Sequence, residues 1–199
     1  SSVGISLFDT AAQTFAPFKI MENGKDVFAD NIAYHIREDS KHNLWFTTNL
    51  GLISYNPGTQ KHRWYKLVES GIGVTSCTDI HEDRKGRFWV TTWGAGLTSF
   101  DPGTGKFNAF KVHAGNNSIS TNSTMEIFED SHGLLYIGSQ NGGVIVFDPD
   151  KETFKIYRHR AGDSTSVSNN VAKNYIESKS GIIWIGTVGG GINAFDPVE

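Results

Sequence analysis

Short apolar runs alternate with polar turn sequences along the whole chain, and no run reaches the length of a membrane-spanning helix. One apolar phrase occurs four times, at 44–48, 88–92, 135–139 and 183–187, and its second residue is always aromatic. These aromatics are Trp45, Trp89, Tyr136 and Trp184, which are 44, 47 and 48 residues apart in turn. Repeats of this period are typical of solenoids, propellers and arrays.

Further positions recur around each aromatic. A Glu-Asp pair, or Glu-Ser in the last copy, ends six residues before it, and a Gly-aliphatic pair and then an aromatic-Asp-Pro or aromatic-Asn-Pro sequence follow it. The acidic pairs are Glu38-Asp39, Glu82-Asp83, Glu129-Asp130 and Glu177-Ser178. Residues 4–9 match 96–101, so the chain opens within a repeat, and we expect it to be a segment of a longer protein.

Each copy predicts four short strands. The first strand runs into the acidic pair, and the Asp then begins a hairpin turn whose Gly accepts a positive φ. In the first copy His42-Asn43 replaces that Gly, and Asn43 is expected to take the left-handed conformation. The aromatic phrase is the second strand, the Gly-aliphatic phrase the third, and paired aromatics mark the fourth. No stretch shows sustained helical periodicity.

The predicted fold is therefore all-β, built from β-propeller blades that are four-stranded antiparallel meanders. About four repeats form one domain over 1–199, a segment of a larger propeller. We expect a partial blade over 1–30, blades over about 31–68, 74–113 and 121–160, and an incomplete blade over 170–199. Such a segment leaves open sheet edges, which predicts a homodimer or another edge-mediated self-association.

Composition narrows the function classes. The chain is 38% hydrophobic and 12% aromatic, which is enough apolar surface for a folded core. With a net charge of -3, the chain lacks the positive electrostatic field that binding to nucleic acid phosphates needs. The N-terminus has no basic-then-apolar pattern, so we expect neither a signal peptide nor membrane contact in this segment.

The repeats resemble the two-component regulator propeller repeat, which builds the extracytoplasmic sensor of hybrid two-component histidine kinases in polysaccharide-degrading bacteria. The resemblance extends from about Gly4 to Pro197, and 130–133, 168–170 and 181–192 carry it most closely. Two features depart from the pattern: Tyr136 replaces Trp, and Thr47 and Thr91 replace Gly. The resemblance implies a seven-bladed propeller in the periplasm, as the extracytoplasmic part of an inner-membrane protein.

Candidate ligand-binding residues lie where the repeat varies. The connection between the second and third strands carries Asn49, Trp93 and Gln140 in the first three copies. An exposed aromatic beside amides suits a sugar, because its ring stacks on CH groups while amides bond hydroxyls. The alternative is that Trp93 packs over a neighbouring blade and the amides cap turns. The recurring aromatics are expected to be structural core: Trp45, Trp89, Tyr136 and Trp184.

The remaining reactive residues predict no catalytic or metal site. The acidic pairs recur in every copy at a hairpin, where turn capping explains them, whereas a catalytic pair is normally unique. The histidines show no metal-ligand spacing, and no cofactor is expected. Cys77 aligns with small residues and is interpreted as a buried apolar side chain.

The resemblance thus implies a non-catalytic sensor segment that binds oligosaccharides from polysaccharide breakdown and signals to transcription. The full-length protein would be a histidine kinase. Two alternatives stay open: a propeller enzyme resembling the streptogramin lyases, which use a histidine and a magnesium ion, or a protein-interaction scaffold.

Overall fold

The computed structural model describes residues 4–29, 31–73 and 76–197, so the predicted unit boundaries at 1, 30, 74 and 199 lie outside it. Its strands form antiparallel meanders in chain order. The first four-stranded sheet contains β5 (Ala33–Glu38), β6 (Leu44–Thr48), β7 (Gly51–Tyr55) and β8 (His62–Lys66). The second contains β9 (Ser76–Glu82), β10 (Phe88–Trp93), β11 (Leu97–Asp101) and β12 (Lys106–Phe110).

The C-terminal strands continue the pattern. The third meander contains β13 (Thr124–Glu129), β14 (Leu135–Ser139), β15 (Val144–Asp148) and β16 (Thr153–Tyr157). The last contains β17 (Ala172–Glu177), β18 (Ile183–Thr187) and β19 (Gly191–Phe195), and one pairing, Ser139 with Ala172, joins it to β14. This is the predicted all-β fold class, and it is confirmed.

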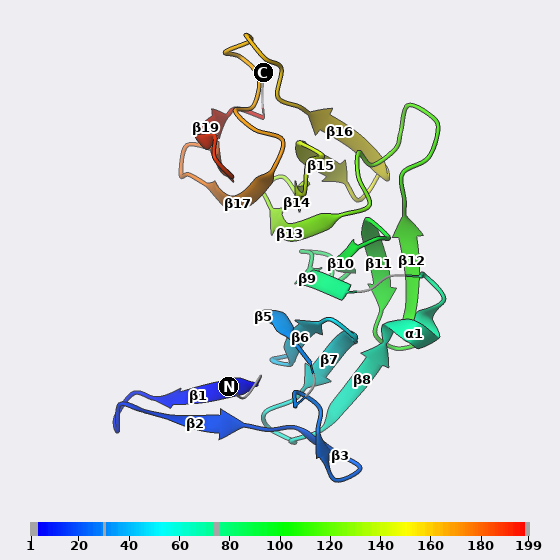
Figure 1. The fold of residues 1–199 in the computed structure, drawn as a ribbon, viewed down its shortest axis with the longest axis vertical. Coiled ribbons are helices and arrows are strands. Elements are labelled where there is room, and N and C mark those ends of the chain that lie inside the picture. Colours follow the sequence, from blue (N-terminus) through cyan, green and yellow to red (C-terminus); the bar gives the residue numbers. More distant parts are fainter. Residues whose placement is uncertain (1–3, 30, 74–75, 198–199) are drawn as a thin grey trace.

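Two small hairpins precede these sheets, formed by β1 (Ile5–Asp9) with β2 (Thr14–Phe18) and by β3 (Met21–Glu22) with β4 (Lys25–Asp26). A four-residue helix that the sequence did not predict, α1 (Leu67–Ser70), follows β8. Figure 1 shows the sheets side by side along an arc, with their first strands on its inner side and β8, β12 and β16 on its outer side. The β1–β2 hairpin and the β17–β19 sheet stand at the two ends of that arc.

The hydrophobic core lies between consecutive sheets. Trp45 packs with Cys77, Ile80 and Phe100 of the second sheet, and Trp89 packs with Ile127 and Phe147 of the third. Tyr136 packs with Ala172 and Ile185 of the last sheet. Each of these three aromatics is thus buried by the sheet that follows it.

Trp184 departs from the prediction that all four recurring aromatics lie in the core. It has the same place in its strand as the others, but its side chain is 44% exposed. The physical reason is that no further sheet covers this face in the part of the chain that the structure describes. Register alone places the ring, whereas its burial depends on the neighbouring sheet.

The Asp of each Glu-Asp pair closes its own turn. Asp83 Oδ1 accepts hydrogen bonds from the backbone N–H groups of Lys85 and Arg87, and Oδ2 accepts the Trp89 indole N–H, all at 2.9 Å. Burial opposes ionisation of Asp83, but the bonds from Trp89 and Arg87 outweigh it and lower its pKa. Asp39 and Trp45 repeat the arrangement.

The third sheet varies this turn because Tyr136 replaces Trp. Asp130 Oδ1 still accepts two backbone N–H groups at 2.9 Å. The buried Asp130 Oδ2 and Tyr136 hydroxyl make no hydrogen bond, and burial together with the Asp130 charge raises the pKa of Tyr136. Tyrosine therefore fills the core position without reproducing the indole bond.

The turn of the first sheet corrects one prediction. His42, and not Asn43, adopts the left-handed conformation, with a φ of 61° at the place of Gly86, whose φ is 76°. Asn43 instead donates its side-chain amide to Asp39 Oδ2 at 2.9 Å. In both turns the left-handed residue is the third after the Asp, and His is among the residues that tolerate this backbone conformation.

The Glu of the second, third and fourth acidic pairs ties adjacent sheets together, because it caps the turn of the preceding sheet. Glu82 accepts the Ser40 backbone N–H at 2.5 Å, and Glu177 accepts that of Ser131 at 2.7 Å. Glu129 accepts Arg84 Nε–H at 2.7 Å and lies 2.9 Å from His81 Nε2. One dipeptide thus stabilises two consecutive turns.

The two threonines that replace Gly also connect sheets. The Thr47 hydroxyl donates to the carbonyl of Thr78 in the second sheet at 3.1 Å, and the Thr91 hydroxyl donates to that of Met125 in the third. At the equivalent Gly138 a Cβ would lie only 3.1 Å from the Ala172 carbonyl oxygen. The departures from the repeat are therefore compatible with the blade core and add hydrogen bonds across it.

Candidate functional site

Trp93 ends β10 at the same end of the sheets as the other second-to-third strand connections. Its side chain is 37% exposed, and its ring centroid lies 5.6 Å from that of Tyr34 on β5. Its backbone forms an isolated bridge with Ser123, which precedes β13. Trp93 therefore contacts the sheets on both sides of its own and presents a two-ring aromatic surface with Tyr34.

Asn49 and Gln140 follow the second strands of the sheets on either side of Trp93. The Asn49 side-chain oxygen accepts the Ile32 backbone N–H at 2.7 Å, so this amide caps its connection. Gln140 is exposed, and its backbone N–H donates to the Ser123 carbonyl at 3.0 Å. The three residues form a row across adjacent sheets, with the aromatic in the middle.

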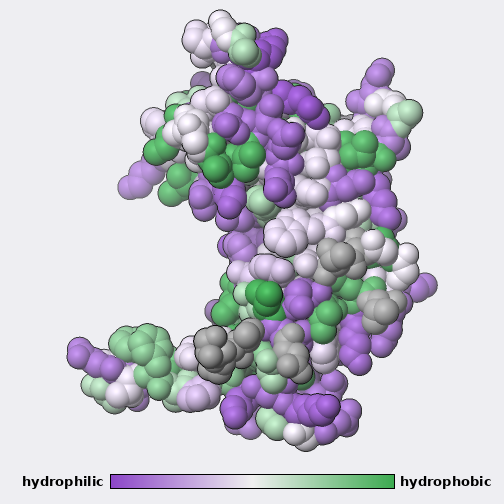
Figure 2. Space-filling view, in the orientation of Figure 1, coloured by the Kyte–Doolittle hydropathy of each residue, from purple (hydrophilic) through white to green (hydrophobic). Residues whose placement is uncertain are grey.

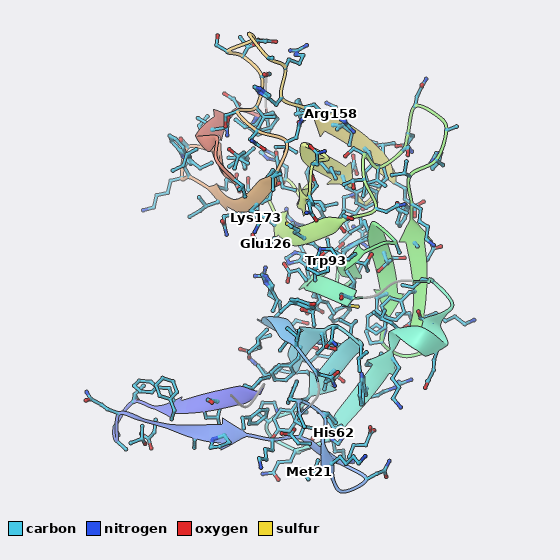
Figure 3. All side chains as sticks on the ribbon, in the orientation of Figure 1. Met21, His62, Trp93, Glu126, Arg158 and Lys173 are labelled. Atoms are coloured by element: carbon cyan, nitrogen blue, oxygen red, sulfur yellow. The ribbon has the colours of Figure 1, made fainter. Side chains whose placement is uncertain are left out.

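A second row of polar side chains was missed by the sequence reasoning. His35, Asp79, Glu126 and Asn174 each stand one place before the apolar residue that marks the first strand. These strands line the inner side of the arc, and Figure 3 places Glu126 and Lys173 along it. The sequence does contain a signal for this row, because the position is polar in every copy and a different residue occupies it in each of the four.

Asp79 is the centre of the inner row. It is fully buried and accepts Arg37 Nε–H at 3.0 Å and Nη2–H at 2.7 Å from the first sheet. It also accepts the Ile127 backbone N–H at 3.0 Å from the third sheet, and His35 Nδ1 lies 3.5 Å away. The bonds to Asp79 raise the pKa of Arg37. This carboxylate therefore holds three sheets together.

Beside this network lies a small cavity of about 140 Å³ lined by Arg37, Glu126, Phe128, Asn174 and Tyr175. Asn174 donates its side-chain amide to Glu126 Oε2 at 3.3 Å, and the Tyr175 hydroxyl donates to the Ile137 carbonyl at 3.1 Å. A guanidinium, a carboxylate and an amide within one cavity offer donors and acceptors of the kind that bind hydroxyl groups.

The acidic pairs and Cys77 have structural roles. The acidic pairs cap turns, as described above, and burial raises the pKa of the Cys77 thiol. Within residues 4–29, 31–73 and 76–197, no group of three or more His, Cys, Asp or Glu side chains is arranged to hold a metal ion. None of the helices there is long and apolar enough to cross a bilayer.

Solved structures with a similar fold include extracellular domains of bacterial signalling proteins. One, the extracellular domain of the proposed hybrid two-component system BT4673 from B. thetaiotaomicron, is 25% identical over 96% of this chain and 24% of that chain, with a TM-score of 0.73. Another BT4673 structure, described as a proposed one-component system, is 24% identical over 98% of this chain and 25% of that chain, with a TM-score of 0.74.

More distant matches have the same architecture. The extracellular domain of the proposed hybrid two-component system BT3049, from the same organism, is 21% identical over 97% of this chain and 30% of that chain, with a TM-score of 0.64. The WD40 propeller of Doa1 is 12% identical over 90% of this chain and 57% of that chain, with a TM-score of 0.62. The fold is thus of the β-propeller type, and the chain spans about a quarter of the BT4673 chains. No family model and no curated protein matches the chain.

Proposed function

We propose that this chain is a non-catalytic part of the periplasmic sensor of a hybrid two-component system. The observation that carries the proposal is the similarity over 96% of the chain to the extracellular domain of BT4673 at 25% identity. The repeat sequences support it separately, because their motifs resemble those of the two-component regulator propellers.

The ligand that we propose is an oligosaccharide released from a polysaccharide. The exposed Trp93 ring lies beside the half-buried Tyr34 ring, with their centroids 5.6 Å apart, and Gln140 presents an amide at the same end of the next sheet. Sugars match this combination, because their CH faces stack on aromatic rings and their hydroxyls bond amides. Asn49 has a supporting role, since its oxygen already caps a backbone N–H.

The proposed mechanism is a shift between two arrangements of paired sensors. A ligand changes this equilibrium only by as much as its affinity differs between the two arrangements. A histidine kinase elsewhere in the full-length protein would convert the shift into phosphoryl transfer and a change in transcription.

A thermal-shift screen with neutral and acidic oligosaccharides tests the sensor proposal. We expect one glycan class to raise the melting temperature, with its Kd then measured by calorimetry. Trp93→Ala should weaken that glycan about tenfold, because an aromatic contact of about 1.4 kcal/mol is lost. Met21→Ala is the matched control, since it removes another exposed apolar side chain, on β3 and far from Trp93 (Figure 3).

Two results would contradict the proposal. If no glycan raises the melting temperature, the oligosaccharide ligand is wrong and a protein-interaction scaffold is favoured. If a glycan binds but Trp93→Ala and Met21→Ala both keep the wild-type affinity, the binding site lies elsewhere on the chain.

A further inference from the structure

Arg84 shows how the groove between two consecutive sheets holds a guanidinium group. Its Nε–H donates to Glu129 Oε1 and its Nη1–H to the Ser131 carbonyl, both at 2.7 Å, and its Nη2–H donates to the Asp130 carbonyl. The group also lies over Gly133, where an added Cβ would be 3.4 Å from Arg84 Nε. The Glu129 carboxylate and the turn after it in the third sheet are therefore a binding site for one guanidinium, which the second sheet supplies.

The groove between the first and second sheets contains the same set of acceptors. The tripeptide Glu82-Asp83-Arg84 has the place that Glu129-Asp130-Ser131 has in the third sheet, so one carboxylate and two carbonyl groups stand at equivalent positions. The first sheet, however, has Ser40 where the second has Arg84. The shorter side chain leaves a cavity of about 470 Å³, which the tripeptide, Ser40 and Gly86 help to line.

The surface over Gly86 is open in this groove. An added Cβ at Gly86 would meet one atom within 4 Å, which is Glu82 Oε1 at 3.8 Å. At the equivalent Gly133, by contrast, the three atoms nearest to an added Cβ all belong to the Arg84 side chain. The two grooves thus share the same turn geometry, but a guanidinium covers the turn in one of them.

The Glu82 carboxylate has only neutral donors among the residues that the structure describes. It accepts the Ser40 backbone N–H at 2.5 Å and the Ser40 hydroxyl at 2.8 Å. The equivalent Glu129 accepts the charged Arg84 guanidinium at 2.7 Å. Hydrogen bonds between a charged donor and a carboxylate are stronger than bonds from neutral donors, so Glu82 gains by exchanging the Ser40 hydroxyl for a cation.

The charge around this cavity also favours a cation. The arginines beside it are all paired with carboxylates; the pairs are Arg37 with Asp79, Arg84 with Glu129 and Arg87 with Asp83. Glu38 and Glu82 line the cavity too, and neither pairs with an arginine or lysine in the described part of the chain. The first strands face the inner side of the arc, and Figure 2 shows hydrophilic residues along the middle of that side. Carboxylates therefore outnumber guanidinium groups at the cavity, which attracts a positive charge.

We propose that this groove binds the side chain of an arginine on a partner protein, in the way that the next groove binds Arg84. Glu82 accepts one N–H in place of the Ser40 hydroxyl, the two turn carbonyls accept two more, and the planar group lies over Gly86. The arginines that line the cavity are already paired with carboxylates, so they do not provide a partner for a free α-carboxylate. An arginine within a peptide chain therefore fits better than the free amino acid.

The site lies at the turn end of the sheets. Trp93 ends β10 at the opposite end, since the turn that carries Gly86 comes directly before that strand. The inference therefore does not rest on the sensor proposal, and either can fail without the other.

Titration with Nα-acetyl-L-arginine methylamide, followed by two-dimensional NMR of the isotope-labelled chain, tests the site. We expect saturable shifts of the backbone amide signals of 40–42 and 82–86, with a Kd on the order of 1 mM because one side chain supplies the contact. The citrulline analogue has a similar shape without the charge, and it should bind about tenfold more weakly.

Three variants make the test specific. Ser40→Arg should abolish binding of the arginine probe and raise the melting temperature, because its own guanidinium occupies the groove. Ser40→Ala is the matched control; it removes the hydroxyl that competes for Glu82 but leaves the groove open, so it should bind the probe at least as tightly as the wild type. Arg84→Ala opens the next groove, so it should bind a second equivalent of the probe and show added shifts at 129–133.

Any of five results would overturn the proposal. The probe could cause no saturable shift in the millimolar range, or the citrulline analogue could bind as tightly. Ser40→Arg could keep the wild-type affinity for the probe. Arg84→Ala, with the circular dichroism of the wild type, could gain no second equivalent. Free L-arginine could bind about tenfold more tightly than the capped probe, in which case the occupant is the amino acid and not a protein side chain.

Discussion

Neutralising Glu129 tests whether the acidic pairs hold consecutive sheets together through charge. The Glu129 side chain is 10% exposed and accepts Arg84 Nε–H at 2.7 Å and the Arg84 backbone N–H at 3.2 Å, with His81 Nε2 at 2.9 Å. Burial opposes its ionisation, but the bonds from His81 and Arg84 outweigh it and lower its pKa. Glu129→Gln keeps the shape and removes the charge.

The expected loss is about 2 kcal/mol of unfolding free energy near neutral pH, the usual value for hydrogen bonds to a charged group. For a chain of this length, that loss lowers the melting temperature by about 4–8 °C. Because the pKa of Glu129 is lower in the folded state, its charge stabilises the fold above the unfolded pKa. This stability is lost as the pH falls through the folded pKa. The difference between wild type and variant should therefore shrink as the pH falls below the ordinary glutamate pKa of 4.5.

Urea unfolding followed by tryptophan fluorescence and circular dichroism measures both effects in dilute protein. Glu82→Gln is the matched control, because Glu82 caps the same type of turn through the neutral Ser40 N–H and hydroxyl groups. Its loss should be smaller, about 1 kcal/mol or less. An unchanged stability for Glu129→Gln, or a deficit that persists in acid, would refute the charged link between sheets.

Two further substitutions test local details of the fold. Thr91→Val should cost about 1–3 kcal/mol of unfolding free energy in urea, because it leaves the part-buried Met125 carbonyl without its hydroxyl donor. Thr98→Val, whose lost bond to the Val90 carbonyl lies within one sheet, should cost about 1 kcal/mol, and equal costs would contradict a special role for the link between sheets. His42→Gly should raise the melting temperature by a few degrees, since glycine adopts a φ of 61° without steric cost; a decrease would mean that the contact of His42 with Glu38 at 2.5 Å outweighs the strain.

Part of the candidate site follows from the sequence and part does not. Trp93 could be found because it interrupts a repeated connection, and its partner Tyr34 could not, because their contact joins side chains 59 residues apart in the chain. The hydrogen bonds between Arg37 and Asp79 could likewise not be predicted from the sequence. Both positions are ordinary strand residues when each copy is considered alone.

The sequence by itself determined the order, type and approximate length of the strands, because alternation and turn chemistry act between neighbours in the chain. It also identified which residues occupy equivalent places in each sheet. Only the tertiary structure decided which residues at the same repeat position also have the same surroundings. Trp45 is buried, for example, while Trp184 is exposed. The reason is physical. A strand forms from its own residues and its paired neighbours, but the burial of its faces and the partners of its Glu and Arg side chains depend on a separate sheet packed against it.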